Sequence, residues 1–143
     1  MGHTFEVNTQ WKTGTFSGTI EPQAVSPAIG FGVPKEFGGP GGEWTPEHFL
    51  AAAVSTCVQA TFLMVARASK AEISGYEARC ECTMAQKQTG FEVTSVTLAP
   101  RITVADDANR ERAERAIEKA EQLCPISKAL DGLVHLEAEV VVS

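Results

Sequence analysis

The longest apolar segment of the chain covers residues 49–66, which carry no charged side chain. Thr45, Pro46 and Glu47 precede it, and these residue types favour the N-cap and the first turn of a helix. We therefore predict a helix over residues 45–69. A helix that is apolar on all sides lies in a protein core or in a membrane. The hydroxyl and amide side chains within this segment favour the core, with a sheet on one side and a second subunit as a candidate for the other.

The segment 76–86 alternates between apolar and polar residues, which is typical of a half-buried strand. A turn at residues 87–90 and a second strand over 91–104 complete a predicted β-hairpin, in which Pro100 indicates an edge or a bulge. The apolar face of the first strand carries five side chains: Tyr76, Ala78, Cys80, Cys82 and Met84.

Apolar residues recur at helical spacing over residues 106–123, where the other positions are mostly charged. This pattern predicts an amphipathic, half-exposed helix whose charged face is solvated. Pro125 is expected to start a short helix that ends at Gly132. Residues 133–142 are predicted to form a single final strand.

The N-terminal part combines strand-like segments, at residues 4–7 and 13–20, with a region rich in glycine and proline. Residues 21–44 predict a loop with at most one short strand, near residues 28–33. Hairpins and two main helices make an α+β fold. We expect a single domain over residues 1–143, with antiparallel sheets around a long buried central helix.

The charge balance narrows the range of partners. The chain has a formal net charge of −6, and its 12 basic residues form no cluster. This argues against nucleic acid or an anionic membrane as a partner. The N-terminus has no basic segment followed by an apolar run, so we expect no signal peptide and a cytoplasmic protein.

Four cysteines carry the candidate chemistry: Cys57, Cys80, Cys82 and Cys124. Without a secretory signal, reduced thiols or redox chemistry are favoured over structural disulfides. Packing on the strand face explains Cys80 and Cys82, and a metal site at this Cys-x-Cys pair is the alternative. Their spacing does not match a zinc site, so we predict no metal. Cys57 lies within the apolar helix, so a purely structural role in the core is also open.

Cys124 directly precedes Pro125, which disfavours the α conformation at the cysteine. If Pro125 is the first residue of the short helix, Cys124 is its N-cap. A thiol at a helix N-terminus has a lowered pKa and is reactive. The alternative interpretation is an apolar residue that ends the preceding helix.

Two segments, GGPGGEWTPEHFLAAAVSTC at 38–57 and LCPISKAL at 123–130, together resemble the OsmC/Ohr family of thiol-dependent peroxidases. The name combines osmotically inducible protein C and organic hydroperoxide resistance protein. That family has a Gly-rich loop, a Pro-Glu pair that opens a central helix, a cysteine ten residues after the glutamate, and a second cysteine in a Cys-Pro-x-Ser motif. The matching residues are Pro46, Glu47, Cys57 and the motif that starts at Cys124.

The resemblance implies an OsmC-like fold, an intertwined homodimer with active sites at the subunit interface, and a cysteine-based peroxidase. Cys57 would be the peroxidatic cysteine, which attacks an organic hydroperoxide or hydrogen peroxide and becomes a sulfenic acid. Cys124 would resolve it as a Cys57–Cys124 disulfide. An external dithiol, of lipoyl type on a lipoylated protein or another thiol, would restore both thiols. No bound cofactor is expected.

Glu47 is the third site residue that the resemblance implies. Ten helical residues separate it from Cys57 by about 15 Å along the axis, so we expect it to serve the Cys57 of a second subunit. The family holds an arginine from the N-terminal β region with this glutamate, but the chain has no arginine before Arg67. Three other side chains are candidates to replace it, although a lysine lacks the bidentate fork of arginine: Lys12, Lys35 and His48.

A function of a different class is the alternative. The same fold can hold a noncatalytic or weakly active small-molecule binding protein with an apolar pocket at the subunit interface. The missing arginine favours this alternative, because the peroxidatic thiolate then lacks its usual positive partner.

Overall fold

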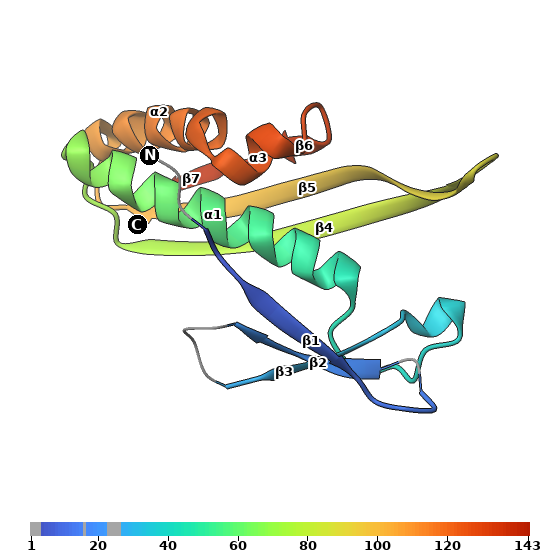
Figure 1. Ribbon diagram of the computed structural model, residues 1–143. Helices are drawn as coiled ribbons and strands as arrows, with labels where there is room; N and C mark the ends of the chain where they lie inside the picture. The colour runs from blue at the N-terminus through green and yellow to red at the C-terminus, as the bar shows by residue number, and fades with distance from the viewer. Residues whose placement is uncertain (1–3, 16, 23–26) are drawn as a thin grey trace. The chain divides into compact units, whose positions relative to one another are not determined.

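The computed structural model describes residues 4–15, 17–22 and 27–143 (Figure 1). The chain divides into two compact units, residues 1–49 and residues 50–143, and each unit is described by itself. The division falls in the first turn of helix α1 (Pro46–Ala68). The single domain over residues 1–143 stays a prediction.

The first unit contains a three-stranded antiparallel sheet with β2 in the centre. The predicted short strand near residues 28–33 is confirmed. The first strand, predicted over residues 4–7, lies further along the chain. The second, predicted over residues 13–20, begins only at Ser17, because Gly14, with a φ of 82°, lies in a turn. Phe16, and residues 23–26 of the predicted loop, lie outside the described residues. The strands are β1 (Val7–Trp11), β2 (Ser17–Pro22) and β3 (Ile29–Gly32).

The glycine-rich segment leads from β3 to α1 through a short 3-10 helix, η1 (Lys35–Phe37). Gly41 and Gly42 both have a φ of 74°, a conformation that side chains with a Cβ rarely adopt. The segment returns alongside β3, where the Gly32 N–H donates to the Trp44 carbonyl at 2.8 Å. The turn therefore delivers the chain to the start of α1.

Thr45 caps α1 through a reciprocal pair of hydrogen bonds with His48. The Thr45 hydroxyl accepts from the His48 backbone N–H at 3.3 Å, and the Thr45 N–H donates to Nδ1 of His48 at 3.1 Å. This arrangement is a capping box in which histidine replaces the usual glutamate. The predicted N-cap and first helical residue, Thr45 and Pro46, are confirmed.

The second unit has a four-stranded sheet in which β4 and β5 form the predicted antiparallel hairpin. The last two strands pair with β5 in parallel, so the sheet is mixed and the expectation of antiparallel pairing is corrected for these strands. The reason is that two helices return the chain to Val96, midway along β5, as parallel pairing requires. The strands are β4 (Gly75–Lys87), β5 (Gly90–Val104), β6 (Val134–Leu136) and β7 (Glu139–Val142).

Pro100 lies where the neighbour of β5 changes from β6 to β7. β6 pairs with β5 as far as Leu98, and β7 pairs with it from Arg101 onward. Proline has no N–H for a hydrogen bond with a neighbouring strand, so it fits this gap. The single final strand predicted over residues 133–142 is therefore two strands.

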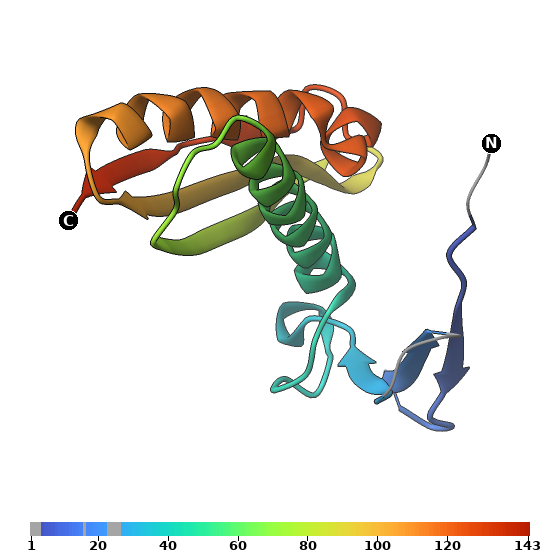
Figure 2. The same ribbon diagram turned by 90° about the vertical axis from the view of Figure 1, so that its left-hand side faces the viewer.

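Helices α2 (Asp107–Leu123) and α3 (Pro125–Ala129) follow the hairpin, and α2, in orange, lies along the sheet (Figures 1 and 2). Helix α2 begins one residue after the predicted start, with Asp106 as its N-cap, and ends at Leu123 as predicted. Helix α3 ends before the expected Gly132. The α+β class is confirmed. The buried core joins α1, β5 and α2 through Val54, Val58, Phe62, Ala66, Val96, Leu98, Ile102, Val104, Ala113, Ala116, Ile117, Ala120 and Cys124.

The buried residues of α1 recur at every fourth position and form a single stripe. On another side of the helix, Leu63 and Met64 are 45% and 72% exposed. Within the described chain, α1 is thus buried on one side only. It is the one described helix with the length and composition of a membrane span, and its stripe packs in the protein core.

The face of α2 can be tested by two neighbouring substitutions. Ile117 is 1% exposed, and Ile117→Ala is expected to lower the free energy of unfolding by about 2–5 kcal/mol because it leaves a cavity. The adjacent Glu118 is exposed, and Glu118→Ala is expected to change the free energy of unfolding by less than about 0.5 kcal/mol. Urea unfolding followed by circular dichroism measures both. Equal losses would contradict the placement of Ile117 in the core.

Candidate active site

Cys57 and Cys124 are in contact in the second unit. Cys57 lies on α1 next to the buried Val58, and Cys124 lies between α2 and α3. Both thiols are free, and the side chains of Cys57 and Cys124 share a hydrogen bond. Cys57 is half-buried, whereas Cys124 is 0% exposed. The fold therefore pairs an accessible thiol with an inaccessible one.

Cys124 is the N-cap of α3, as the Cys-Pro pair predicts. Its backbone is extended, with φ −62° and ψ 117°, and Pro125 is the first residue of the helix. The Ser127 backbone N–H donates to the Cys124 sulfur at 3.5 Å. The same cysteine also ends α2, since its N–H donates to the Ala120 carbonyl at 2.9 Å. Both interpretations of this position, helix start and helix end, are therefore correct.

The surroundings of the two sulfurs shift their pKa values in opposite directions. Burial, followed by the contact with Cys124, raises the pKa of the Cys57 thiol. Burial alone would raise the pKa of Cys124 too, but the hydrogen bonds with the Cys57 side chain and with Ser127 outweigh it and lower that pKa. Hydrogen bonds to Cys124 therefore offset the effect of its burial.

Two polar side chains near the sulfurs were not predicted as site residues. The Thr61 hydroxyl, one turn after Cys57 on α1, hydrogen-bonds to Cys57 and favours its thiolate. The hydroxyl of Ser127 is shielded from solvent and has no hydrogen bond of ordinary geometry to any described residue, yet it lies close enough to lower the pKa of Cys124. The sequence signal for Thr61 is its spacing of four residues, which places it on the same side of the helix as Cys57.

Glu47 and its candidate partners lie in the first unit. The Glu47 oxygen Oε2 is shielded from solvent and has no hydrogen-bond partner among the described residues. Lys12 and Lys35 are exposed, and neither binds this oxygen within the described chain. The Nδ1 of His48 lies 3.1 Å from the Thr45 backbone nitrogen and 2.9 Å from the Thr45 hydroxyl, so this side chain is engaged in the cap of α1.

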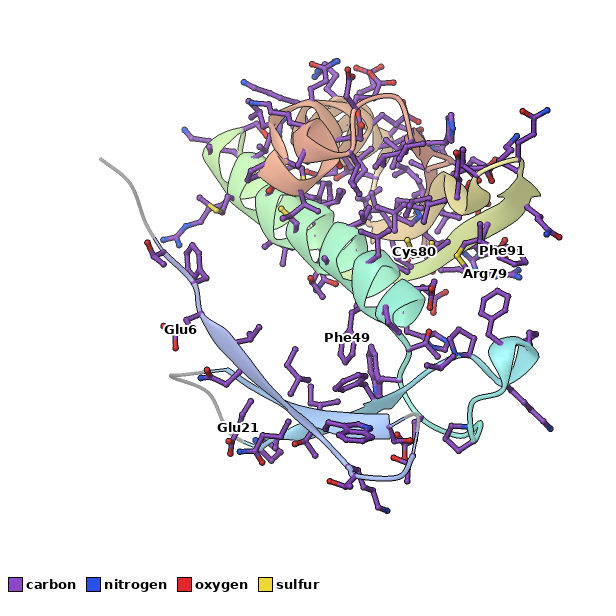
Figure 3. The ribbon with its side chains drawn as sticks, turned by 45° about the vertical axis from the view of Figure 1, so that its right-hand side comes forward. Glu6, Glu21, Phe49, Arg79, Cys80 and Phe91 are labelled. Carbon is purple, nitrogen blue, oxygen red and sulfur yellow. The ribbon has the colours of Figure 1, made fainter. Side chains whose placement is uncertain are left out.

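Cys80 and Cys82 lie on the inner face of β4, opposite Leu98 and Val96 of β5, and pack against the core. Cys80 is labelled in Figure 3. Burial and the neighbouring Cys82 raise the pKa of Cys80, which disfavours the thiolate that binds metals. No cluster of three or more metal-ligating side chains occurs in the part of the chain that the structure describes.

A groove of about 630 Å³ runs between α1 and α2. Thr61, which contacts Cys57, lies in it, and three cations of α2 line it without an ion pair to any described residue. Arg112, Arg115 and Lys119 are exposed, so the predicted solvation of the charged face of α2 is confirmed. The lining residues are Thr61, Met64, Val65, Ala68, Ser69, Arg112, Arg115, Ala116, Lys119 and Leu123.

Residues 39–139 match the model of the OsmC-like protein family. The chain belongs to this family. The matched region includes the three predicted site residues, Glu47, Cys57 and Cys124. The resemblance predicted from the two segments is confirmed.

Relatives of this OsmC-like chain include proteins named for hydroperoxide resistance. "Organic hydroperoxide resistance protein-like 2" of Staphylococcus saprophyticus is 34% identical over 78% of this chain and 78% of its own length. "Uncharacterized protein YmaD" of Bacillus subtilis is 28% identical over 98% of this chain and 95% of its own length.

Solved structures share the OsmC-like fold along the whole chain. The Legionella pneumophila "organic hydroperoxide resistance protein OsmC" superposes with a TM-score of 0.78 at 26% identity, and covers 98% of each chain. An OsmC-like protein of Vibrio cholerae superposes with a TM-score of 0.81 over 98% of this chain and 100% of its own. Its identity is 18%, so this likeness shows the fold alone.

Thr61→Val tests the hydroxyl that favours the Cys57 thiolate. Valine keeps the shape but removes the donor, so the pKa of Cys57 should rise further and less thiolate should form at neutral pH. Loss of a hydrogen bond of ~0.7 kcal/mol corresponds to about threefold slower alkylation of Cys57 by iodoacetamide. Thr56→Val is the matched control, because the Thr56 hydroxyl donates to the Ala52 carbonyl instead. Equal rates in both variants would exclude a role for Thr61.

Proposed function

We propose that the protein is a thiol-dependent peroxidase that reduces organic hydroperoxides, with hydrogen peroxide as a second candidate substrate. The contact between a half-exposed Cys57 and a fully buried Cys124 is the observation that carries this proposal. A pair of this kind suits a cycle in which the accessible thiol reacts with the peroxide and the buried thiol then forms a disulfide with it. The names of the relatives support the same substrate class.

The cycle has three chemical stages. The Cys57 thiolate attacks the O–O bond of the hydroperoxide, which releases an alcohol and leaves a sulfenic acid on Cys57. Cys124 then displaces hydroxide from that sulfur and forms the Cys57–Cys124 disulfide. An external dithiol, on a lipoylated protein or a smaller molecule, reduces the disulfide by exchange. The chain itself needs no bound cofactor for these steps.

The functional form is proposed to be a homodimer in the cytoplasm. The exposed apolar side of α1, at Leu63 and Met64, supports a second subunit, because soluble chains rarely leave such a face uncovered. The unpartnered Oε2 of Glu47 supports a cation from elsewhere in the assembly as its partner. Lys12, Lys35 and His48 are the candidates for that cation.

A noncatalytic or weakly active binding protein is the second candidate function. The groove between α1 and α2 favours it, because an apolar floor with cations at its rim fits an apolar molecule that carries a negative charge. In this case the thiols would be structural and peroxide would leave them unchanged.

Peroxide treatment of the reduced protein distinguishes the two functions. With excess cumene hydroperoxide, the peroxidase function predicts rapid loss of two thiols per chain and a mass decrease of about 2 Da from the disulfide. The measurement is a free-thiol titration with intact and peptide mass spectrometry. Cys57→Ser should abolish the reaction, because the attacking thiolate is gone.

Cys80→Ser is the matched control for this assay. It removes a half-buried thiol that has no part in the proposed cycle, so peroxide consumption should persist. Thiols that survive for hours in excess peroxide would exclude the peroxidase function and leave the binding function.

The binding function predicts that the groove distinguishes anions from neutral molecules of equal length. Isothermal titration should show tighter binding of decanoate than of decanol. Arg115→Gln combined with Lys119→Gln should weaken decanoate binding by about tenfold, since two partly exposed ion pairs contribute about 1 kcal/mol or slightly more in total. Arg79→Gln, on the exposed face of β4, should leave it unchanged. Equal affinities for the two ligands would contradict an anion site in the groove.

A further inference from the structure

One end of the groove between α1 and α2 lies beside the two candidate site cysteines. On α1, Thr61 lines the groove one helical turn after Cys57, and on α2, Leu123 lines it and directly precedes Cys124. Residues four positions apart lie on the same side of a helix, so the groove reaches the side of α1 that carries Cys57. Every lining residue belongs to residues 50–143, so the groove is a feature of the second unit alone.

The groove continues along both helices as far as the end of α1. At this far end the Arg112 guanidinium donates to the Lys70 carbonyl at 3.3 Å, which joins α2 to the residues that follow α1. Figure 2 shows the C-terminal end of α1, in green, against α2, in orange. On α2, Lys119 lies about 6 Å and Arg115 about 12 Å before Leu123, at about 1.5 Å per residue. Positive charge is therefore placed at two defined distances from the thiol end of the groove.

The cations of the groove are available to a ligand. Arg112, Arg115 and Lys119 are exposed, and none of them forms an ion pair with a described residue. Glu111 and Glu118 lie four residues before and three residues after Arg115, yet neither pairs with it in the described chain. The chain as a whole has a net charge of −6 and repels anions, whereas these three charges attract an anion to the groove.

The rest of the groove suits an apolar chain. Its volume of about 630 Å³ is in the range of small-molecule sites and exceeds what a small thiol fills. A ligand that lies along it contacts apolar side chains from both helices, beside the cations of α2. These apolar side chains are Met64, Val65, Ala68, Ala116 and Leu123.

Of the two reactants in the proposed cycle, the reductant fits this charge better than the peroxide. Thiol–disulfide exchange proceeds by attack of a thiolate, which is an anion. A hydroperoxide is neutral at the oxygen that the cysteine attacks. Positive charge beside the thiols therefore assists the approach of the reductant in particular.

We propose that the groove binds the external reductant, and that this reductant is a free dithiol whose apolar chain ends in an anionic group. Its thiols lie at the Cys57 end, its chain lies on the apolar side chains, and its anionic group lies between Lys119 and Arg115, about 6–12 Å away. This inference rests on the peroxidase function proposed above and names the class of reductant for that cycle.

The exchange needs no further reactant. One thiolate of the bound dithiol attacks the Cys57 sulfur of the Cys57–Cys124 disulfide, because Cys124 is buried. The protein disulfide breaks, a mixed disulfide forms on Cys57, and Cys124 leaves as a thiolate that takes up a proton. The second thiol of the ligand loses its proton and attacks its partner sulfur, which closes a cyclic disulfide and releases Cys57. Two electrons and two protons pass from the dithiol to the protein.

Dihydrolipoate and dihydrolipoamide test the anionic group, because they share a chain and a dithiol but end in a carboxylate and a neutral amide. The protein is oxidised with one equivalent of cumene hydroperoxide and mixed with each dithiol. Alkylation stops the reaction, and intact mass spectrometry measures the disulfide that remains. At low ionic strength the second-order rate constant should be about tenfold higher for dihydrolipoate. At about 1 M salt, where the Debye length is about 3 Å, most of this preference should disappear.

Two variants locate the preference in the groove. Arg115→Gln combined with Lys119→Gln should slow dihydrolipoate by about tenfold and leave dihydrolipoamide within about twofold. Lys128→Gln is the matched control, because this exposed lysine lies four residues after Cys124 but outside the groove. Its preference for dihydrolipoate should equal that of the wild type.

Equal rate constants for the two dithiols in the wild type would overturn the inference. A groove that another segment or a second subunit fills would give this result. The same loss of preference in Lys128→Gln as in the double variant would also overturn it. If the double variant does not fold, the wild type decides by itself, since a preference that persists at about 1 M salt is not electrostatic and contradicts the proposal. Failure of cumene hydroperoxide to form the disulfide would instead exclude the peroxidase function, and this inference with it.

Discussion

The packing of α1 on the core of the second unit determines the direction in which Cys57 faces. Val54, Val58 and Phe62 are completely buried at every fourth position, which fixes the rotation of the helix about its axis. Cys57 directly precedes Val58, so it lies at the border of the buried stripe. A rotation by one residue, or about 100°, would turn the thiol either into the core or away from Cys124. The accessible half of the thiol pair therefore depends on apolar packing.

The buried half depends on a chain reversal between two helices. Cys124 ends α2 and starts α3, so its sulfur lies where backbone N–H groups have no carbonyl partner within the helix. These donors offset the effect of burial, which by itself would raise the pKa of the Cys124 thiol. Backbone N–H groups and hydroxyl groups therefore modify the pKa values of both thiols. The chain reversal at Cys124 supplies several of these groups.

Local patterns predicted most elements because their causes are local. The proline and the capping residues before α1 placed its start correctly, and alternation along β4 placed Cys80 and Cys82 on the inner face. The prediction was weaker where pairing between distant segments decides the outcome. Nothing in residues 133–142 showed that the strand would divide beside Pro100 or that both parts would run parallel to β5.

For the candidate site too, some properties follow from the sequence and others only from the tertiary structure. The sequence alone determined its chemistry: a cysteine in an apolar helix, a second at a Cys-Pro helix start, and no arginine in the N-terminal region. Motif and composition are properties of short segments, so they can be read without coordinates. Only the tertiary structure decided that Cys57 contacts Cys124 and that Thr61 and Ser127 lie close to the two sulfurs. Burial and hydrogen bonding arise between segments far apart in the chain, and these effects set the ionisation of a thiol.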